Sequence, residues 1–148
     1  MRKLLTAATL GLATLAGPAA QAQEDQTANK MVTILATDEP QTQLMSMVLT
    51  MQSMQAGAEA YVLLCGPAGD LALKEPPAAA TAPQKPKGMS PQGLMQKVMA
   101  QGGTVEVCAI YLPNKGVGAD ALLDGVTAAK PPAMAARLLA ERTRIMSF

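Results

Sequence analysis

Cys108 is the side chain in this sequence that is best placed to do chemistry. It ends an apolar run that begins at Thr104, and a loop containing proline, asparagine and glycine follows it. In open α/β sheets, ligands and reacting groups gather at the carboxyl ends of parallel strands, so a thiol at a strand end is placed for use. The chain has no histidine, which removes the commonest general base and metal ligand. Sulfur is therefore the main reactive option, and Cys108 is the predicted catalytic residue.

The second cysteine, Cys65, ends another predicted strand and is the secondary candidate. In an oxidising compartment, two cysteines are expected by default to form a disulfide. In a doubly wound sheet of strand order 2-1-3, however, the first strand separates the two cysteines. Their Cα atoms would then lie about 9 to 10 Å apart, beyond the limit of roughly 7 Å for a disulfide. This geometry argues against a bond between Cys65 and Cys108.

Residues 1–22 have the pattern of an export signal. Arg2 and Lys3 precede an apolar stretch over residues 4–15, and the small residues Ala20 and Ala22 predict cleavage before Gln23. The apolar stretch is shorter than the roughly 20 residues that cross a membrane as a helix. We therefore expect a soluble protein of the periplasm, not bound to the membrane, with residues 23–148 forming a single domain.

The charge and aromatic content of the mature chain exclude several classes of function. Without the leader, ten basic and eleven acidic residues remain, with two tyrosines, one phenylalanine and no basic run. Such a chain lacks the basic surface with which proteins bind nucleic acid. The sequence also has no Gly-x-Gly-x-x-Gly, no P-loop and no nucleophile elbow. The sequence therefore favours neither hydrolase nor dehydrogenase chemistry, and we expect no cofactor and no metal site.

Strand and helix patterns alternate along the mature chain. Short β-branched or apolar runs predict strands over residues 31–38, 60–65, 104–108, 125–130 and 143–148. Helices are predicted over residues 40–55, 91–102 and 119–123 and from 131 onward, with Asp38 and Ser90 as N-caps of the first two. The alternation predicts an α/β fold, a three-layer α/β/α domain with a mostly parallel five-stranded sheet.

A proline-rich segment over residues 75–91 interrupts this pattern. Its five prolines among alanines and lysines exclude a helix or a paired strand of any length. It is read either as a solvated surface insertion or as a flap near the Cys108 end of the sheet.

The order of elements over residues 94–148 resembles the DsrE/DsrF-like family. The resemblance rests on a helix that ends at glycine, a strand that ends at Cys108, Gly116 eight residues later, a segment near Gly125, and a final helix leading into a hydrophobic strand. Residues 32–69 match more loosely. The resemblance implies a small flavodoxin-like α/β domain that forms a homo-oligomer, a trimer or hexamer.

In the sulfur-relay members of that family, a cysteine at this strand end carries sulfane sulfur as a persulfide. By position this residue is Cys108, and the resemblance implies a protein partner that donates or accepts the sulfur. A reactive thiolate needs a nearby cation or helix N-terminus. Lys115 is the candidate cation, and the backbone amides from Asn114 to Gly116 are candidate donors. Pro113 is expected to end any helix at or before Leu112.

Two other functions stay open. Thiols together with Met45, Met47, Met51 and Met54 suggest a soft-metal site for Cu(I), although the same helical spacing is typical of a core-facing stripe. The other alternative is a non-catalytic periplasmic protein that binds a ligand or assembles into oligomers. The turn from Cys65 to Gly69 has the glycines of an anion-cradling loop but lacks the residues that would make it specific.

Overall fold

A five-stranded, all-parallel sheet forms the centre of the protein. The computed structural model describes residues 29–148, so the predicted leader lies outside the described residues. The strand order is β4-β3-β2-β1-β5, and the strands are β1 Lys30–Leu35, β2 Glu59–Leu64, β3 Thr104–Val107, β4 Thr127–Ala128 and β5 Thr143–Ser147. The predicted α/β fold with a parallel five-stranded sheet is confirmed.

The expected order of the first three strands is wrong. β2 lies between β1 and β3 and pairs with both of them, whereas the order 2-1-3 would place β1 in the middle. The chain leaves β2, crosses one face of the sheet and returns directly beside it as β3. Connections between sequence-adjacent parallel strands often take this short path.

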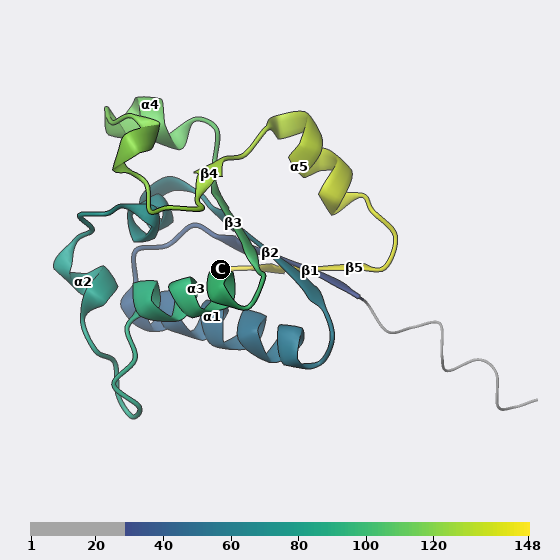
Figure 1. Ribbon diagram of the computed structural model, residues 1–148, viewed down its shortest axis with the longest axis horizontal. Coiled ribbons are helices and arrows are strands. Elements are labelled where there is room, and N and C mark those ends of the chain that lie inside the picture. Colours follow the sequence, from purple (N-terminus) through teal and green to yellow (C-terminus); the bar gives the residue numbers. More distant parts are fainter. Residues whose placement is uncertain (1–28) are drawn as a thin grey trace, which may run out of the picture.

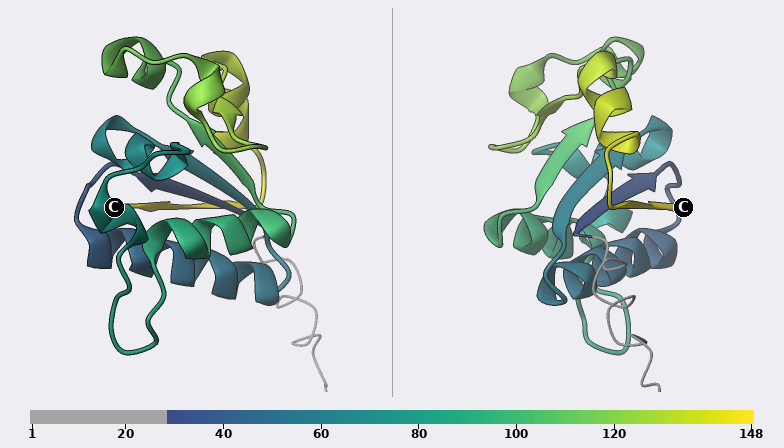
Figure 2. Two further views of the ribbon diagram at one scale, coloured as in Figure 1. Left: turned by 60° about the vertical axis from the view of Figure 1, so that its left-hand side comes forward. Right: turned by 90° about the vertical axis from the view of Figure 1, so that its right-hand side faces the viewer.

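Helices cover both faces of the sheet. α1 (Pro40–Gln55) and α3 (Pro91–Ala100) pack side by side on one face, and α5 (Pro131–Leu138) lies on the other, as Figures 1 and 2 show. The last strand, β5, adds to the free edge of β1. The short helix α4 (Tyr111–Lys115) lies on the same side as α5, above the ends of the central strands.

The strands bury alternate side chains in two hydrophobic clusters, as expected for a sheet covered on both faces. Leu35, Val62, Leu64, Val105 and Val107 are almost completely buried in the larger cluster, with Met47, Met51 and Met95. Val32, Tyr61 and Leu63 form the smaller cluster with Met134 of α5. The larger cluster also includes residues of α1 and α3, so it lies between the sheet and these two helices.

Two N-caps were predicted, and one of them is correct. The Ser90 side chain accepts a hydrogen bond from the Gly93 amide at the start of α3. At α1, Glu39 rather than Asp38 is the cap, and its carboxylate accepts from the amides of Gln41 and Thr42. These bonds lower the pKa of Glu39. Glu39 is the residue after Asp38 and directly precedes Pro40. Its side chain is longer than that of aspartate and reaches both amides.

The proline-rich segment folds back along α1. It contains one helical turn, α2 (Ala78–Thr81), and an antiparallel bridge between Gln84 and Met89. Its residues 83–87 line a groove of about 670 Å³ together with Gln41, Leu44, Met45 and Val48 of α1. At its end, the buried Gln92 side chain donates to the carbonyls of Leu71 and Leu73. The segment thus lies against α1, and the bonds of Gln92 join the start of α3 to the chain that precedes the segment.

No helix among residues 29–148 is long and apolar enough to cross a membrane.

Candidate functional site

Cys65 and Cys108 lie opposite each other at the carboxyl edge of the sheet and form a disulfide. Leu64 of β2 pairs with Val107 of β3, and each cysteine is the next residue along its strand. Their Cα atoms are 5.1 Å apart, close to the spacing between neighbouring strands. The prediction that the two cysteines are too distant to bond is wrong, because it depended on the incorrect strand order.

The backbone of both cysteines continues the sheet. The Cys65 amide donates to the carbonyl of Leu35 and the Cys108 amide donates to that of Leu64, each at 2.8 Å. Both side chains are half-buried and pack against the smaller hydrophobic cluster under α5, which Cys108 bridges to the larger one. Sheet hydrogen bonds, and not only the disulfide, therefore fix the positions of the two residues.

A helix that the sequence did not predict follows Cys108. α4 (Tyr111–Lys115) contains Pro113, which was expected to end any helix at or before Leu112. Pro113 lies in the first turn of α4. Backbone N–H groups in a first turn have no intrahelical acceptor, so a proline there removes no hydrogen bond. Gly116 closes α4 with a left-handed backbone (φ 74°), and its amide donates to the carbonyl of Leu112.

The predicted activating groups Asn114, Lys115 and Gly116 are all engaged in or beside α4. The Lys115 ammonium lies 2.7 Å from Oδ1 of Asp70. The amides of Asn114 and Gly116 donate within the helix, and the Asn114 side chain donates to the carbonyl of Ile110 at 2.7 Å. These residues stabilise the loop after Cys108, and Lys115 has Asp70 as its partner.

Asp70 and Tyr111 were missed by the sequence reasoning, although they join the two loops that follow the cysteines. The Tyr111 hydroxyl donates to Oδ1 of Asp70 at 2.7 Å. Burial, together with this bond, raises the pKa of Tyr111. A Cβ atom on Gly69 would collide with the Tyr111 ring, so a glycine is required there. The glycines at positions 66 and 69, which the sequence suggested for anion binding, thus serve a tight turn and close packing.

A groove of about 430 Å³ lies between these two loops. The loop after Cys65 contributes Gly66, Pro67 and Asp70, and the loop after Cys108 contributes Ile110, Tyr111, Asn114 and Lys115. Ile110 is 71% exposed. The groove is therefore bordered by the exposed Ile110 side chain and the Lys115–Asp70 ion pair, and its lining begins at Gly66, the residue directly after Cys65.

A second polar cluster, also missed, lies under α5. The Tyr61 hydroxyl donates to Glu106, and the Arg137 guanidinium stacks on the Tyr61 ring at 4.2 Å and pairs with Glu106 at 3.4 Å. Burial first, and then Glu106, raise the pKa of Tyr61. An acidic residue between the buried Val105 and Val107 was the available signal, because such a carboxylate needs partners.

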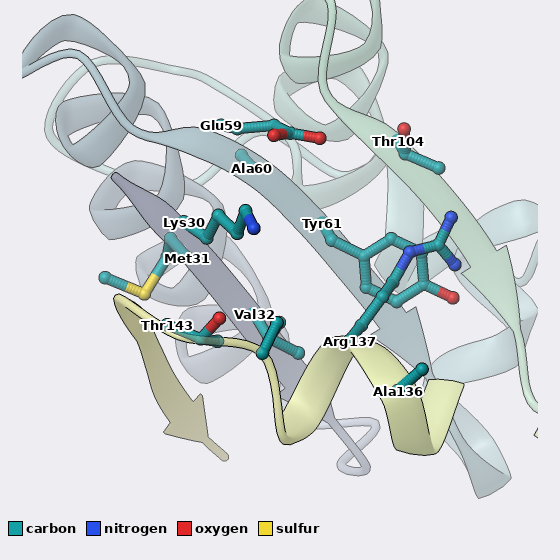
Figure 3. Close-up of a pocket in the computed structure, with 11 residues that line it drawn as sticks. Lys30, Met31, Val32, Glu59, Ala60, Tyr61, Thr104, Ala136, Arg137 and Thr143 are labelled. Atoms are coloured by element: carbon teal, nitrogen blue, oxygen red, sulfur yellow. The ribbon is translucent and has the colours of Figure 1, made fainter. Parts of the chain in front are cut away.

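A groove of about 390 Å³ adjoins this cluster (Figure 3). Its lining includes Lys30, Glu59 and Thr104, the first residues of β1, β2 and β3. It therefore opens at the amino end of the sheet, whereas the disulfide lies at the carboxyl end.

The methionines proposed as soft-metal ligands are divided between the core and the surface. Met47 and Met51 are buried, as the core-facing interpretation predicts, whereas Met45 is 51% exposed. Within residues 29–148, no group of three or more histidine, cysteine, aspartate or glutamate side chains is arranged to hold a metal ion.

Solved structures share this arrangement of strands and helices. The YchN protein of E. coli superposes with a TM-score of 0.63 at 20% identity, covering 81% of this chain and 99% of that one. The chain has a DsrE-like fold. A protein of unknown function from Methanobacterium thermoautotrophicum, MTH1491, matches with a TM-score of 0.60 at 14% identity, covering 80% of this chain and 98% of that one. No protein-family model and no curated protein matches the sequence. At these identities the likeness establishes the fold.

Proposed function

We propose that this protein is exported to the periplasm and accepts sulfane sulfur on Cys108 as a persulfide. The observation that carries the proposal is the position of Cys108, at the carboxyl edge of a DsrE-like sheet and directly before the loop that lines a surface groove. Reactive groups of open α/β sheets gather at this edge. The absence of histidine from the sequence leaves sulfur as the main reactive group there.

The transfer requires the reduced protein. A dithiol first reduces the Cys65–Cys108 disulfide by thiol–disulfide exchange. The Cys108 thiolate then attacks the terminal sulfur of a persulfide donor, R–S–SH. A bond forms between Cys108 Sγ and that sulfur, the S–S bond of the donor breaks, and the donor leaves as the thiolate R–S⁻. The sulfane sulfur, now on Cys108, is passed to an acceptor protein.

Export is supported by two independent features. Residues 1–22 have the charge, apolar stretch and small residues of a cleavable signal. The two cysteines of the mature chain form a disulfide, and disulfides persist in oxidising compartments such as the bacterial periplasm.

A non-catalytic protein is the second candidate, and the pairing of Lys115 with Asp70 favours it. In that case the disulfide serves only to join the ends of β2 and β3. Assembly into homo-oligomers is part of this candidate, and Leu139 (86% exposed) and Ile145 (50% exposed) supply apolar surface near β5.

A cyanolysis assay separates the two candidates. The Cys65→Ser protein, reduced and then freed of reductant, is treated with glutathione persulfide, and its cyanide-labile sulfur is measured. The proposal predicts close to one labile sulfur per chain in Cys65→Ser and none in the matched Cys108→Ser protein. No labile sulfur in Cys65→Ser, with its Cys108 still open to alkylation, contradicts the proposal and supports the non-catalytic protein.

A further inference from the structure

We propose that Cys65 is a resolving residue, so that the reduced protein also converts sulfane sulfur to sulfide. This inference rests on the proposed function, because it needs a persulfide on Cys108. It adds a second reaction at the same edge of the sheet, with a different product and a different final state of the protein.

The position of Cys65 carries the inference. The sheet hydrogen bonds of Cys65 with Leu35 and of Cys108 with Leu64 hold both backbones, so the Cα distance of 5.1 Å does not depend on the disulfide alone. A persulfide on Cys108 therefore forms directly beside a second thiol. Such a neighbour has a high effective concentration, and it competes with any acceptor that must arrive by diffusion.

The reaction balances without an added oxidant. The Cys65 thiolate attacks Cys108 Sγ of the persulfide, and a bond forms between the two cysteine sulfurs. The bond between Cys108 Sγ and the terminal sulfur breaks, and that sulfur leaves as HS⁻ with the electron pair. The two cysteines are oxidised to the disulfide, while the sulfane sulfur is reduced to sulfide. The disulfide of this structure is the product state of the protein.

A further dithiol must return the protein to its reduced form. Both cysteines are half-buried rather than enclosed, and a groove lies between the loops that follow them, lined from Gly66, the residue directly after Cys65. Ile110, 71% exposed at the border of this groove, supplies apolar contact for the loop of a dithiol-bearing reductant. Each turnover thus consumes one dithiol and one sulfane sulfur and yields one sulfide.

The test follows sulfide and protein thiols after one equivalent of glutathione persulfide is added to the reduced, desalted protein without oxygen. The wild-type chain is expected to release about one sulfide as its two thiols become the disulfide, by the exchange described above. In the Cys65→Ser protein the added sulfur, about 32 Da, stays on Cys108 and persists at least about tenfold longer than in wild type. The Cys108→Ser protein should gain neither sulfur nor disulfide.

One result would contradict the resolving role of Cys65, and a different result would contradict the carrier function of Cys108. A wild-type persulfide that lasts as long as that of Cys65→Ser, with no sulfide released, contradicts the resolving role and leaves the carrier function intact. A Cys65→Ser protein that never gains sulfur contradicts the carrier function itself. The wild-type ratio of sulfide released to disulfide formed needs no variant, so the test holds even where a serine variant folds poorly.

Discussion

Cys65 and Cys108 occupy opposed positions one residue beyond the last pair of β2 and β3, with their Cα atoms 5.1 Å apart. Parallel strands in direct register bring the residues that follow them to the same edge of the sheet. Any reaction of one sulfur therefore takes place next to the other. The proposed chemistry at this edge therefore involves both cysteines.

The disulfide is expected to contribute substantially to stability, because it closes a loop between residues that are 43 positions apart. Loop-closure entropy gives about 4 kcal/mol for a loop of this length, and measured values for disulfides are about 2–4 kcal/mol. Denaturant unfolding of the oxidised wild type should thus show a free energy of unfolding higher by about 2–4 kcal/mol than that of the double serine variant. Dithiothreitol should lower the wild-type value and leave the double variant unchanged. A wild-type curve insensitive to dithiothreitol would contradict this prediction.

Gly69→Ala should disturb the loop after Cys108 through Tyr111. The added methyl group meets the Tyr111 ring, and the ring cannot move away without loss of the hydrogen bond to Asp70. Overpacking of this kind costs about 1–3 kcal/mol. Thermal or denaturant unfolding measures the loss. In a Tyr111→Leu background, which removes the ring, Gly69→Ala should cost less; equal costs in both backgrounds would rule out the clash as the cause.

Both tyrosines of the chain should resist ionisation as long as the protein is folded. Burial raises the pKa of Tyr61 and Tyr111, and acidic hydrogen-bond partners raise it further. The unfolded chain releases tyrosine protons near pH 10, whereas the folded chain retains them, so stability contributed by these groups is present below about pH 10 and falls as the pH rises above it. Near-ultraviolet titration should show tyrosinate only as the protein unfolds. Ionisation of both tyrosines near pH 10 in the folded state would contradict this account.

The buried hydroxyls of Thr33 and Thr50 should be energetically coupled. They lie 2.7 Å apart, and the Thr50 hydroxyl donates to the Ser46 carbonyl. Thr50→Val leaves the Thr33 hydroxyl buried without this partner, at a cost of about 1–3 kcal/mol. The double change to valine should cost less than the sum of the single changes, by about 0.5–1.5 kcal/mol. Additive costs in a double-mutant cycle would show that the two hydroxyls do not depend on each other.

The sequence predicted the elements of the fold well because their signals are local. The bounds of α1 (Pro40–Gln55) are those predicted, since a proline in the first turn and recurring apolar residues lie in the segment and Gly57 follows its end closely. The strands were also predicted close to their observed positions, although the second predicted helix ends earlier and residues 119–123 form only a single 3-10 turn, Ala119–Ala121. α4 was not predicted, because Pro113 was interpreted as the end of a helix. The helix begins at Tyr111, so Pro113 lies in its first turn, where proline is tolerated.

The site was predicted less completely, because its parts come from separate segments. The residue types and strand-end positions of Cys65 and Cys108 were correctly inferred, but their pairing depends on the order of the strands, which no local pattern encodes. Likewise, Asp70 and Lys115 are far apart in the sequence and meet only because β2 and β3 are neighbours. A carboxylate that takes Lys115 as its partner cannot be identified from the loop of Lys115 alone.

The central claim is that Cys108 carries sulfane sulfur, and peptide mass spectrometry of the Cys65→Ser protein tests it most directly. The reduced protein is treated with inorganic polysulfide, blocked with an alkylating reagent and digested, and the peptide that contains Cys108 is examined. The account predicts alkylated Cys108 with an added mass of about 32 Da, the mark of a persulfide. A Cys108 peptide that is fully alkylated and never carries the extra sulfur would contradict it.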